Sequence, residues 1–156
     1  MATKLPIDGL EDLPGHYIRR LQQIAVGIFL DEMADVNITP VQFALLFAAS
    51  RQAGLDQRTL AARIGLDTST IGAVVDRLES RELIERKVSP DDKRVRLLSV
   101  TPAGKKLLEG VMPAILRAQE RMLAPLPKAE RPKFIAMVKR IVEENNAWSR
   151  AAKETG

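Results

Sequence analysis

The sequence predicts a mainly helical fold that carries one small β-hairpin. Apolar side chains recur at the three- and four-residue spacing of amphipathic helices over most of the chain. Two β-rich runs, "LIERKV" and "VRLLSV", lie in the middle and are separated by a proline and two aspartates. With 156 residues and 46% hydrophobic composition, we expect a single unit, 1–156, with a substantial core.

The first predicted helix runs from His16 to about Ala34. Its apolar residues lie on more than one side, because Val26 and Leu30 join the stripe that contains Ile24. One packing partner within the same chain would not need so many apolar positions. We therefore expect a second copy of the chain to cover part of this helix.

A capping pattern predicts where the second helix begins. Thr39 is suited to the N-cap, Pro40 to the first helical position, and Gln42 stands where a capping box places its Glu or Gln. This helix is expected to end near Gly54.

The next segment has the internal spacing of a helix-turn-helix. A short helix is predicted over 57–64, and Ala61 is small at the point where two helices would cross. Gly65 follows at the turn, where it can adopt the left-handed conformation, and Ile71 would anchor the following helix. This spacing predicts two short helices that meet at a tight turn.

The outer face of that following helix has the chemistry expected of a DNA-contacting surface. Asp67 or Thr68 is expected to cap the helix, and the inward stripe leaves small or polar side chains outside. Short hydroxyls and a helix N-terminus suit close approach to phosphates, and Arg77 can reach a base edge or a second phosphate. The predicted DNA contacts on this helix are Thr68, Ser69, Thr70, Ala73 and Arg77.

The β-hairpin follows the helix-turn-helix directly, which is the arrangement of a wing. Its tip reads "SPDDKR", and Lys93 and Arg94 are expected to contact DNA there, Arg94 in a narrow minor groove. Asp92 can accept hydrogen bonds from turn amides or from the Arg94 guanidinium, so we interpret it as support for the tip. Asp91 is interpreted as an ordinary turn former.

The C-terminal third is expected to be helical. "TPAG" repeats the Thr-Pro start and opens a long helix, in which Pro113 should produce a bend. "LAPLPKAERP" is a break. The last helix carries an apolar stripe formed by Phe134, Ile135, Val138, Ile141, Val142 and Trp148.

Composition narrows the function classes. The formal net charge is +4, and residues 83–106 alone carry a net +4, so the excess charge lies in and beside the predicted wing. With no cysteine and one histidine, nothing predicts a catalytic constellation, a metal site or a cofactor. The longest near-apolar run, "IAVGIFL", is too short to span a bilayer, and we expect a cytoplasmic protein without membrane contact.

The stretch "STIGAVVDRLESRELIERKVSPDDKRVRLLSVTPAGKKL" resembles the core of the MarR family of winged helix-turn-helix regulators. Asp92-Lys93-Arg94 resembles the Asp-x-Arg wing motif of that family, although Glu82 stands where a glycine often precedes "LI". The resemblance implies a homodimer that binds a pseudo-palindromic double-stranded DNA operator and acts as a repressor. It implies dimerisation helices at 13–36 and 102–152 and a winged helix-turn-helix at 39–101.

The start of the first helix further resembles family members that control aromatic-acid degradation. The effector would then be a small aromatic acid or its coenzyme A thioester. His16, Tyr17, Arg19 and Arg20 offer a ring and cations to such a ligand, and Phe43 and Phe47 are candidate apolar walls. The alternative for the two phenylalanines is a place in the core, for His16 a surface or hinge histidine, and for Arg19 and Arg20 a solvated face.

A second function class remains open at this point. A winged helix can also serve as an architectural or adaptor protein that binds DNA irrespective of sequence and without a small-molecule response.

Overall fold

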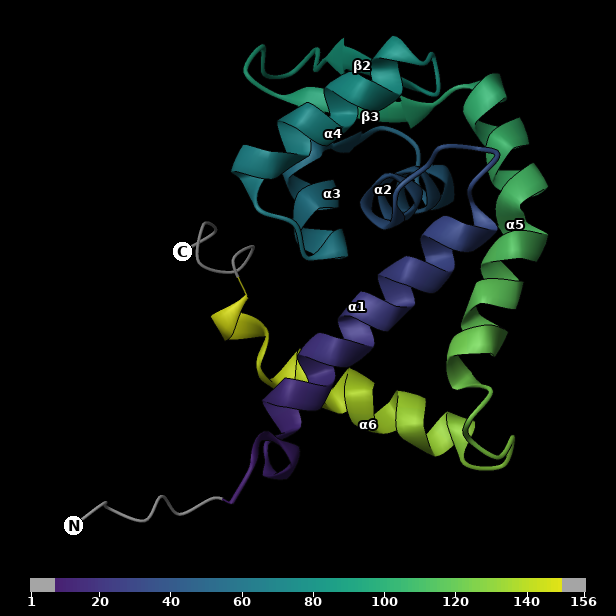
Figure 1. Cartoon of the computed structure of the whole chain (residues 1–156). Coiled ribbons are helices and arrows are strands. Elements are labelled where there is room, and N and C mark those ends of the chain that lie inside the picture. Colours follow the sequence, from purple (N-terminus) through teal and green to yellow (C-terminus); the bar gives the residue numbers. More distant parts are fainter. Residues whose placement is uncertain (1–7, 150–156) are drawn as a thin grey trace.

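The computed structural model describes residues 8–149 and has the predicted fold class, mainly helical with a small antiparallel sheet (Figure 1). The part that holds α2, α3, α4 and the sheet is compact, and α1, α5 and α6 extend from it (Figure 1). In chain order, the elements are η1 (Leu10–Asp12), α1 (Pro14–Glu32), α2 (Pro40–Arg51), β1 (Leu55–Asp56), α3 (Gln57–Ile64), α4 (Thr68–Ser80), β2 (Ile84–Val88), β3 (Arg96–Val100), α5 (Pro102–Leu123), α6 (Arg131–Glu144) and η2 (Asn146–Trp148).

The local signals that predicted helix ends are confirmed. The Gln42 amide donates to the Thr39 hydroxyl at 3.2 Å, and the Thr39 amide donates to the Gln42 side chain at 3.1 Å. This reciprocal pair is the capping box, with Pro40 in the first turn of α2. Gly65 ends α3 with a φ of 70°, in the left-handed region that glycine adopts at little cost.

The sheet has one strand more than the sequence indicated. Strand order is β1-β3-β2, and the predicted hairpin pairs Ile84 with Val100 at one end and Val88 with Arg96 at the other. The extra strand, β1, has two residues and pairs antiparallel with Leu97 and Leu98 of β3. This short strand ties the start of α3 to the hairpin.

The core lies where the end of α1, the helix-turn-helix, the sheet and the start of α5 meet. Ala61 and Ile71 are each 1% exposed, so the two positions that defined the helix-turn-helix spacing are buried as predicted. The largest fully buried side chains are Met33, Ile38, Leu45, Leu46, Leu60, Ile71, Val75, Leu78, Ile84 and Leu98.

The long helix α5 continues through Pro113 and follows a bowed course, in line with the expected bend (Figure 1). The chain then breaks before α6, where Pro132 lies in the first turn and removes no intrahelical hydrogen bond. Trp148 is not on α6, because α6 ends at Glu144 and Trp148 belongs to η2. Residues 150–152 of the predicted C-terminal dimerisation segment lie outside the described residues.

Helices α1 and α6 leave large apolar surfaces uncovered in the single chain. Among the described residues, α6 contributes no side chain to the core. The exposed large hydrophobic residues of α1, α6 and η2 are Tyr17, Ile18, Leu21, Ile24, Leu30, Ile135, Met137, Val138, Ile141, Val142 and Trp148. Within residues 8–149, no helix combines the length and apolar character that a membrane span requires.

Candidate nucleic-acid interface and effector groove

Helix α4 presents the outer face that the sequence predicted. Asp67 caps the helix by accepting a hydrogen bond from the Thr70 amide at 2.8 Å. Ile71, Val75 and Leu78 point into the core and fix the rotation of the helix about its axis. As a result, the predicted DNA contacts are all exposed, namely Thr68, Ser69, Thr70, Ala73 and Arg77.

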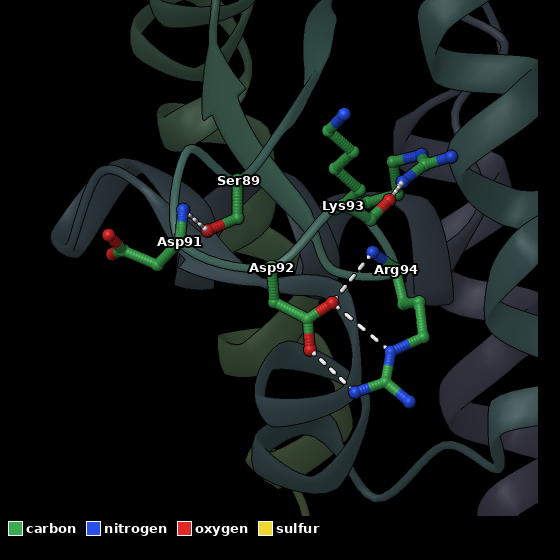
Figure 2. Close-up of polar contacts among 6 residues, drawn as sticks. Ser89, Asp91, Asp92, Lys93 and Arg94 are labelled. Carbon is green, nitrogen blue, oxygen red and sulfur yellow. Dashed lines mark hydrogen bonds and ion pairs between the residues drawn. The ribbon is translucent and has the colours of Figure 1, made fainter.

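The wing tip is organised around Asp92 and Arg94. Asp92 Oδ1 accepts from the Arg94 backbone amide at 2.9 Å and from Nε at 3.2 Å, and Oδ2 accepts from Nη2 at 3.1 Å (Figure 2). The Arg94 side chain nevertheless remains 90% exposed. The hydrogen bonds from the Arg94 side chain and amide lower the pKa of the Asp92 carboxyl. The cation is therefore held in one orientation while staying open to a ligand.

The neighbouring residues of the tip have different roles. The Asp91 amide donates to Ser89 Oγ at 3.2 Å, and its carboxylate points away from Arg94 (Figure 2). Arg96 Nη1 donates to the Lys93 carbonyl at 2.7 Å, which brings a further cation beside the tip. Asp91 thus behaves as the turn former that the sequence suggested.

A groove of about 590 Å³ separates the wing from the N-terminal ends of α3 and α4. Arg58 of α3 and Arg96 of β3 line it, and neither was among the predicted site residues. The side-chain Oε1 of Gln57, another lining residue, is buried without a hydrogen-bond partner. The full lining is Asp56, Gln57, Arg58, Thr68, Ile71, Asp92, Arg94, Val95 and Arg96. Periodicity identified the outer face of α4 but could not reveal which residues would face it across the groove.

An ion-pair cluster fixes the wing against α4. Arg86 of β2 donates from Nη2 to Glu79 at 2.8 Å and to Asp76 at 2.5 Å. Hydrogen bonds to Glu79 and Asp76 raise the pKa of Arg86 further above its ordinary value, so this guanidinium stays charged. The ion pairs therefore connect β2 of the wing rigidly to α4, which sequence reasoning had not foreseen.

The residues predicted to bind an effector fall into two groups. His16 and Tyr17 pack edge to face with ring centroids 5.4 Å apart, and Arg19 donates to Gln23 at 3.4 Å. Phe43 and Phe47 stack with centroids 5.7 Å apart.

A single chain does not bring these two groups together. Phe29, near the end of α1, lies with its ring centroid 6.2 Å from that of Phe43. His16 is on the same helix nearly four turns earlier, and at the rise of an α-helix this places it roughly 20 Å away along α1. Within one chain, the two groups are therefore separated along α1.

A second groove lies between α2 and α5 and has a volume of about 500 Å³. Phe47, 41% exposed, lines it together with Leu108 and Met112, and the cations Arg51 and Lys105 stand at the same groove. Ser50 and Glu109 complete the lining. The groove offers an apolar wall beside two positive charges, a combination that suits an aromatic anion.

The described residues contain no candidate metal site. Across residues 8–149, no group of three or more His, Asp or Glu side chains is arranged so that it could hold a metal ion.

Comparisons with known proteins identify similar sequences and similar folds. The MarR family profile matches residues 38–95, which span the helix-turn-helix and most of the wing. The putative transcriptional regulatory protein for the hcr operon of Thauera aromatica is 32% identical over 85% of this chain and 80% of its own length.

Solved structures match over nearly their full length. The PcaV transcriptional regulator from Streptomyces coelicolor, in complex with its natural ligand, is 36% identical, with 89% of this chain and 98% of that chain covered and a TM-score of 0.81. The transcriptional repressor CouR bound to a 23-mer DNA duplex is 28% identical, with coverages of 90% and 99% and a TM-score of 0.82. CouR from Rhodococcus jostii RHA1 bound to p-coumaroyl-CoA is 26% identical, with coverages of 86% and 95% and a TM-score of 0.76.

The exposed recognition face, the Asp92–Arg94 wing tip and these similarities lead to one assignment. This chain belongs to the MarR family of DNA-binding transcriptional regulators.

Proposed function

We propose that the protein is a homodimeric repressor that binds a pseudo-palindromic operator and is released from it by a small aromatic acid or the coenzyme A thioester of such an acid. The observation that carries the DNA part is the wing tip, where Asp92 orients an Arg94 side chain that remains 90% exposed. The effector part is supported by PcaV, solved with its natural ligand, and by CouR, solved with p-coumaroyl-CoA.

Residues 39–101 would form the DNA-reading unit. Thr68, Ser69 and Thr70 stand at the N-terminal end of α4, where backbone amides and short hydroxyls suit phosphate oxygens. Ala73 leaves room for close approach, and Arg77 extends from the next turn toward a base edge or a second phosphate. The wing would supply Lys93 and Arg94, the latter inserted in the minor groove.

Residues 13–36 and 102–152 would form the dimerisation arms. The apolar side chains that α1 and α6 leave exposed, among them Ile24 at 50% and Val142 at 60%, are numerous for a free surface. A second copy that covers both helices would bury these side chains and supply the second recognition helix. Two half-sites related by a two-fold axis would then match a pseudo-palindromic operator.

The groove between α2 and α5 is the proposed effector site. The ring of an aromatic acid would pack on Phe47, and its carboxylate would lie between Arg51 and Lys105. In the dimer, His16, Tyr17, Arg19 and Arg20 of the other copy would close the site from outside, because within one chain they lie roughly 14–20 Å before Phe29 along α1. Phe43, stacked on Phe47, would support the wall.

Release from DNA follows from thermodynamic linkage. A ligand that prefers dimers with altered recognition-helix spacing lowers operator affinity by the ratio of its affinities for the two arrangements. The groove contacts the start of α5, which leads directly out of the wing strand β3. A ligand in this groove is therefore well placed to shift the wing relative to the arm.

Displacement of bound operator by a panel of aromatic acids and their thioesters tests the effector assignment. Arg51→Ala, Arg19→Ala and Arg20→Ala should each raise the concentration needed for release while operator affinity without ligand is kept. Lys139→Ala, whose ammonium pairs with Glu143 on the polar side of α6, serves as the matched loss of one cation. A normal response in all three variants would move the effector site elsewhere, and no response to any compound would favour an architectural protein.

A further inference from the structure

Arg81, which directly follows recognition helix α4, joins that helix to the linker between α1 and α2. Its Nη1 donates to the Asn37 carbonyl at 2.8 Å, and its Nη2 donates to the Val36 carbonyl at 3.1 Å. The partners lie 44 and 45 positions away in the sequence. Because a guanidinium is planar and its two donors are fixed relative to each other, this contact defines an orientation as well as a distance.

The backbone at both ends of this contact is in the left-handed region. Asn37 has a φ of 52° and Glu82, next to Arg81, a φ of 57°, and within residues 8–149 these are the two non-glycine residues with positive φ. Asparagine tolerates this region, but a glutamate is strained there, and such strain persists where surrounding contacts over-determine the local geometry. The contact between Arg81 and the linker thus joins two turns whose unusual conformations orient its donors and acceptors.

The same turn also contacts the other arm. The Thr101 hydroxyl, at the N-cap of α5, donates to the Glu82 carbonyl at 2.6 Å. The Thr101 amide donates to the Leu83 carbonyl at 3.2 Å. The turn at residues 81–83 is therefore the point where the end of α4 meets both the α1–α2 linker and the start of α5.

We propose that Arg81 is a positioning residue that sets the angle between the recognition helix and the α1 arm, and thereby the spacing and rotation of the two recognition helices in the dimer. This inference rests on the proposed dimeric, operator-binding function. The Thr101 contacts lie within one continuous stretch of chain, whereas the Arg81 contacts connect distant segments. Loss of Arg81 would leave the winged helix folded and still packed on Met33 and Ile38, but without the contact that fixes its angle to the arm.

The role proposed for Arg81 should determine how much operator affinity is lost when the spacing between the two half-sites is changed. One inserted base pair shifts a half-site by ~3.4 Å and rotates it by roughly 35°. A dimer with rigidly placed recognition helices loses affinity steeply on such a change, and a dimer whose helices pivot loses less. We expect the parent protein to prefer its natural operator by at least about tenfold over operators lengthened or shortened by one base pair.

Three variants separate positioning from charge. Arg81→Ala removes the contact, and Arg81→Lys keeps the charge without the two-pronged donor. Both should bind the natural operator less tightly, and both should reduce the spacing preference to about threefold or less. Arg63→Ala is the matched control, because Arg63 donates to Gln52 within the winged-helix unit and does not reach the arm. It should keep the parent preference.

A distance measurement without DNA makes the test independent of the operator. The chain has no cysteine, so Ala62→Cys on the exposed side of α3 places one spin label on each copy. Pulsed electron paramagnetic resonance should give a narrow distribution of distances between the two labels in the parent background and a broader one with Arg81→Ala. Thermal unfolding of each variant establishes that the protein remains folded.

The possible outcomes separate failure of the role proposed for Arg81 from failure of the dimer on which that role depends. An unchanged label distribution and unchanged spacing preference in Arg81→Ala would overturn the role of Arg81. Full restoration of the preference by Arg81→Lys would also overturn it, since charge alone would then suffice. Absence of any distance between copies in the parent background would instead reject the dimer on which the inference depends.

Discussion

Asp92 binds the residue two positions after it through three hydrogen bonds, from the amide, the Nε and the Nη2 of Arg94. A negative charge at the tip of a DNA-binding wing would weaken attraction to phosphates if it acted alone. Here it orders a long side chain that would otherwise lose rotamer freedom on entering a groove. The carboxylate therefore serves the cation, and its value to DNA binding depends on geometry rather than on net charge.

Asp92→Ala should weaken operator binding by about tenfold, although it removes a negative charge from the interface. Arg94→Ala should weaken binding at least as much and leave the dimer intact in sedimentation experiments. Fluorescence anisotropy with labelled operator measures both. Asp91→Ala is the control, because its carboxylate points away from Arg94 (Figure 2) and its removal should not weaken binding. Tighter binding by Asp92→Ala would show that repulsion dominates.

Glu82→Gly should stabilise the protein by about 1 kcal/mol, because Glu82 has a φ of 57° and glycine adopts that conformation without strain. Urea unfolding of the two proteins gives the difference. Ser80→Gly, two residues earlier and still within α4, should do the opposite and cost about 0.5–1 kcal/mol. Equal destabilisation by both substitutions would mean that the strain at Glu82 is absent in solution.

Gly104→Ala should destabilise the protein by about 1–3 kcal/mol. A Cβ at this position would collide with the Leu83 carbonyl oxygen and with the Val100 side chain. The absence of a side chain at Gly104 therefore lets the start of α5 lie close to the turn after α4. Gly110→Ala, on the same helix with open space around it, should instead stabilise by about 0.5–1 kcal/mol. Differential scanning calorimetry distinguishes the two, and a harmless Gly104→Ala would contradict the close approach.

Acid should destabilise the junction between α1 and α5. Hydrogen bonds from Arg121 and Arg117 lower the pKa of Glu32 below its ordinary value of 4.5. A lowered folded-state pKa contributes stability that is fully present above the unfolded value and is lost as the pH falls through the folded value. Glu32→Gln should therefore flatten the decline in melting temperature below about pH 4.5. Arg121→Gln should flatten this decline similarly. An unaltered decline in both variants would mean that the ion pair between Glu32 and Arg121 does not contribute to stability.

Local chemistry predicted the elements and much of the site. The capping box at Thr39, the turn at Gly65 and the support of Arg94 by Asp92 each involve residues a few positions apart, so the sequence contains the whole interaction. Glu82 stands where such sequences often have glycine, and its backbone is left-handed with a φ of 57°.

The features that the sequence did not reveal depend on contacts between distant segments. β1 has two residues and exists through its pairing with β3, about 40 positions later. Arg86 meets Asp76 and Glu79 through the turn after α4, and Arg81 reaches the α1–α2 linker. The groove between α2 and α5 is likewise assembled from residues more than 50 positions apart. Periodicity assigns a side chain to a face but does not identify which other face it meets.

Fluorescence anisotropy on DNA from upstream of the protein's own gene, against scrambled DNA of equal length, distinguishes an operator-specific regulator from an architectural protein. Each titration is run with and without the panel of aromatic acids and their coenzyme A thioesters. We expect a preference of at least ~10³ for the natural DNA and release by one class of compound. Equal affinity for both DNAs, weakened alike by salt and unmoved by every compound, would contradict it.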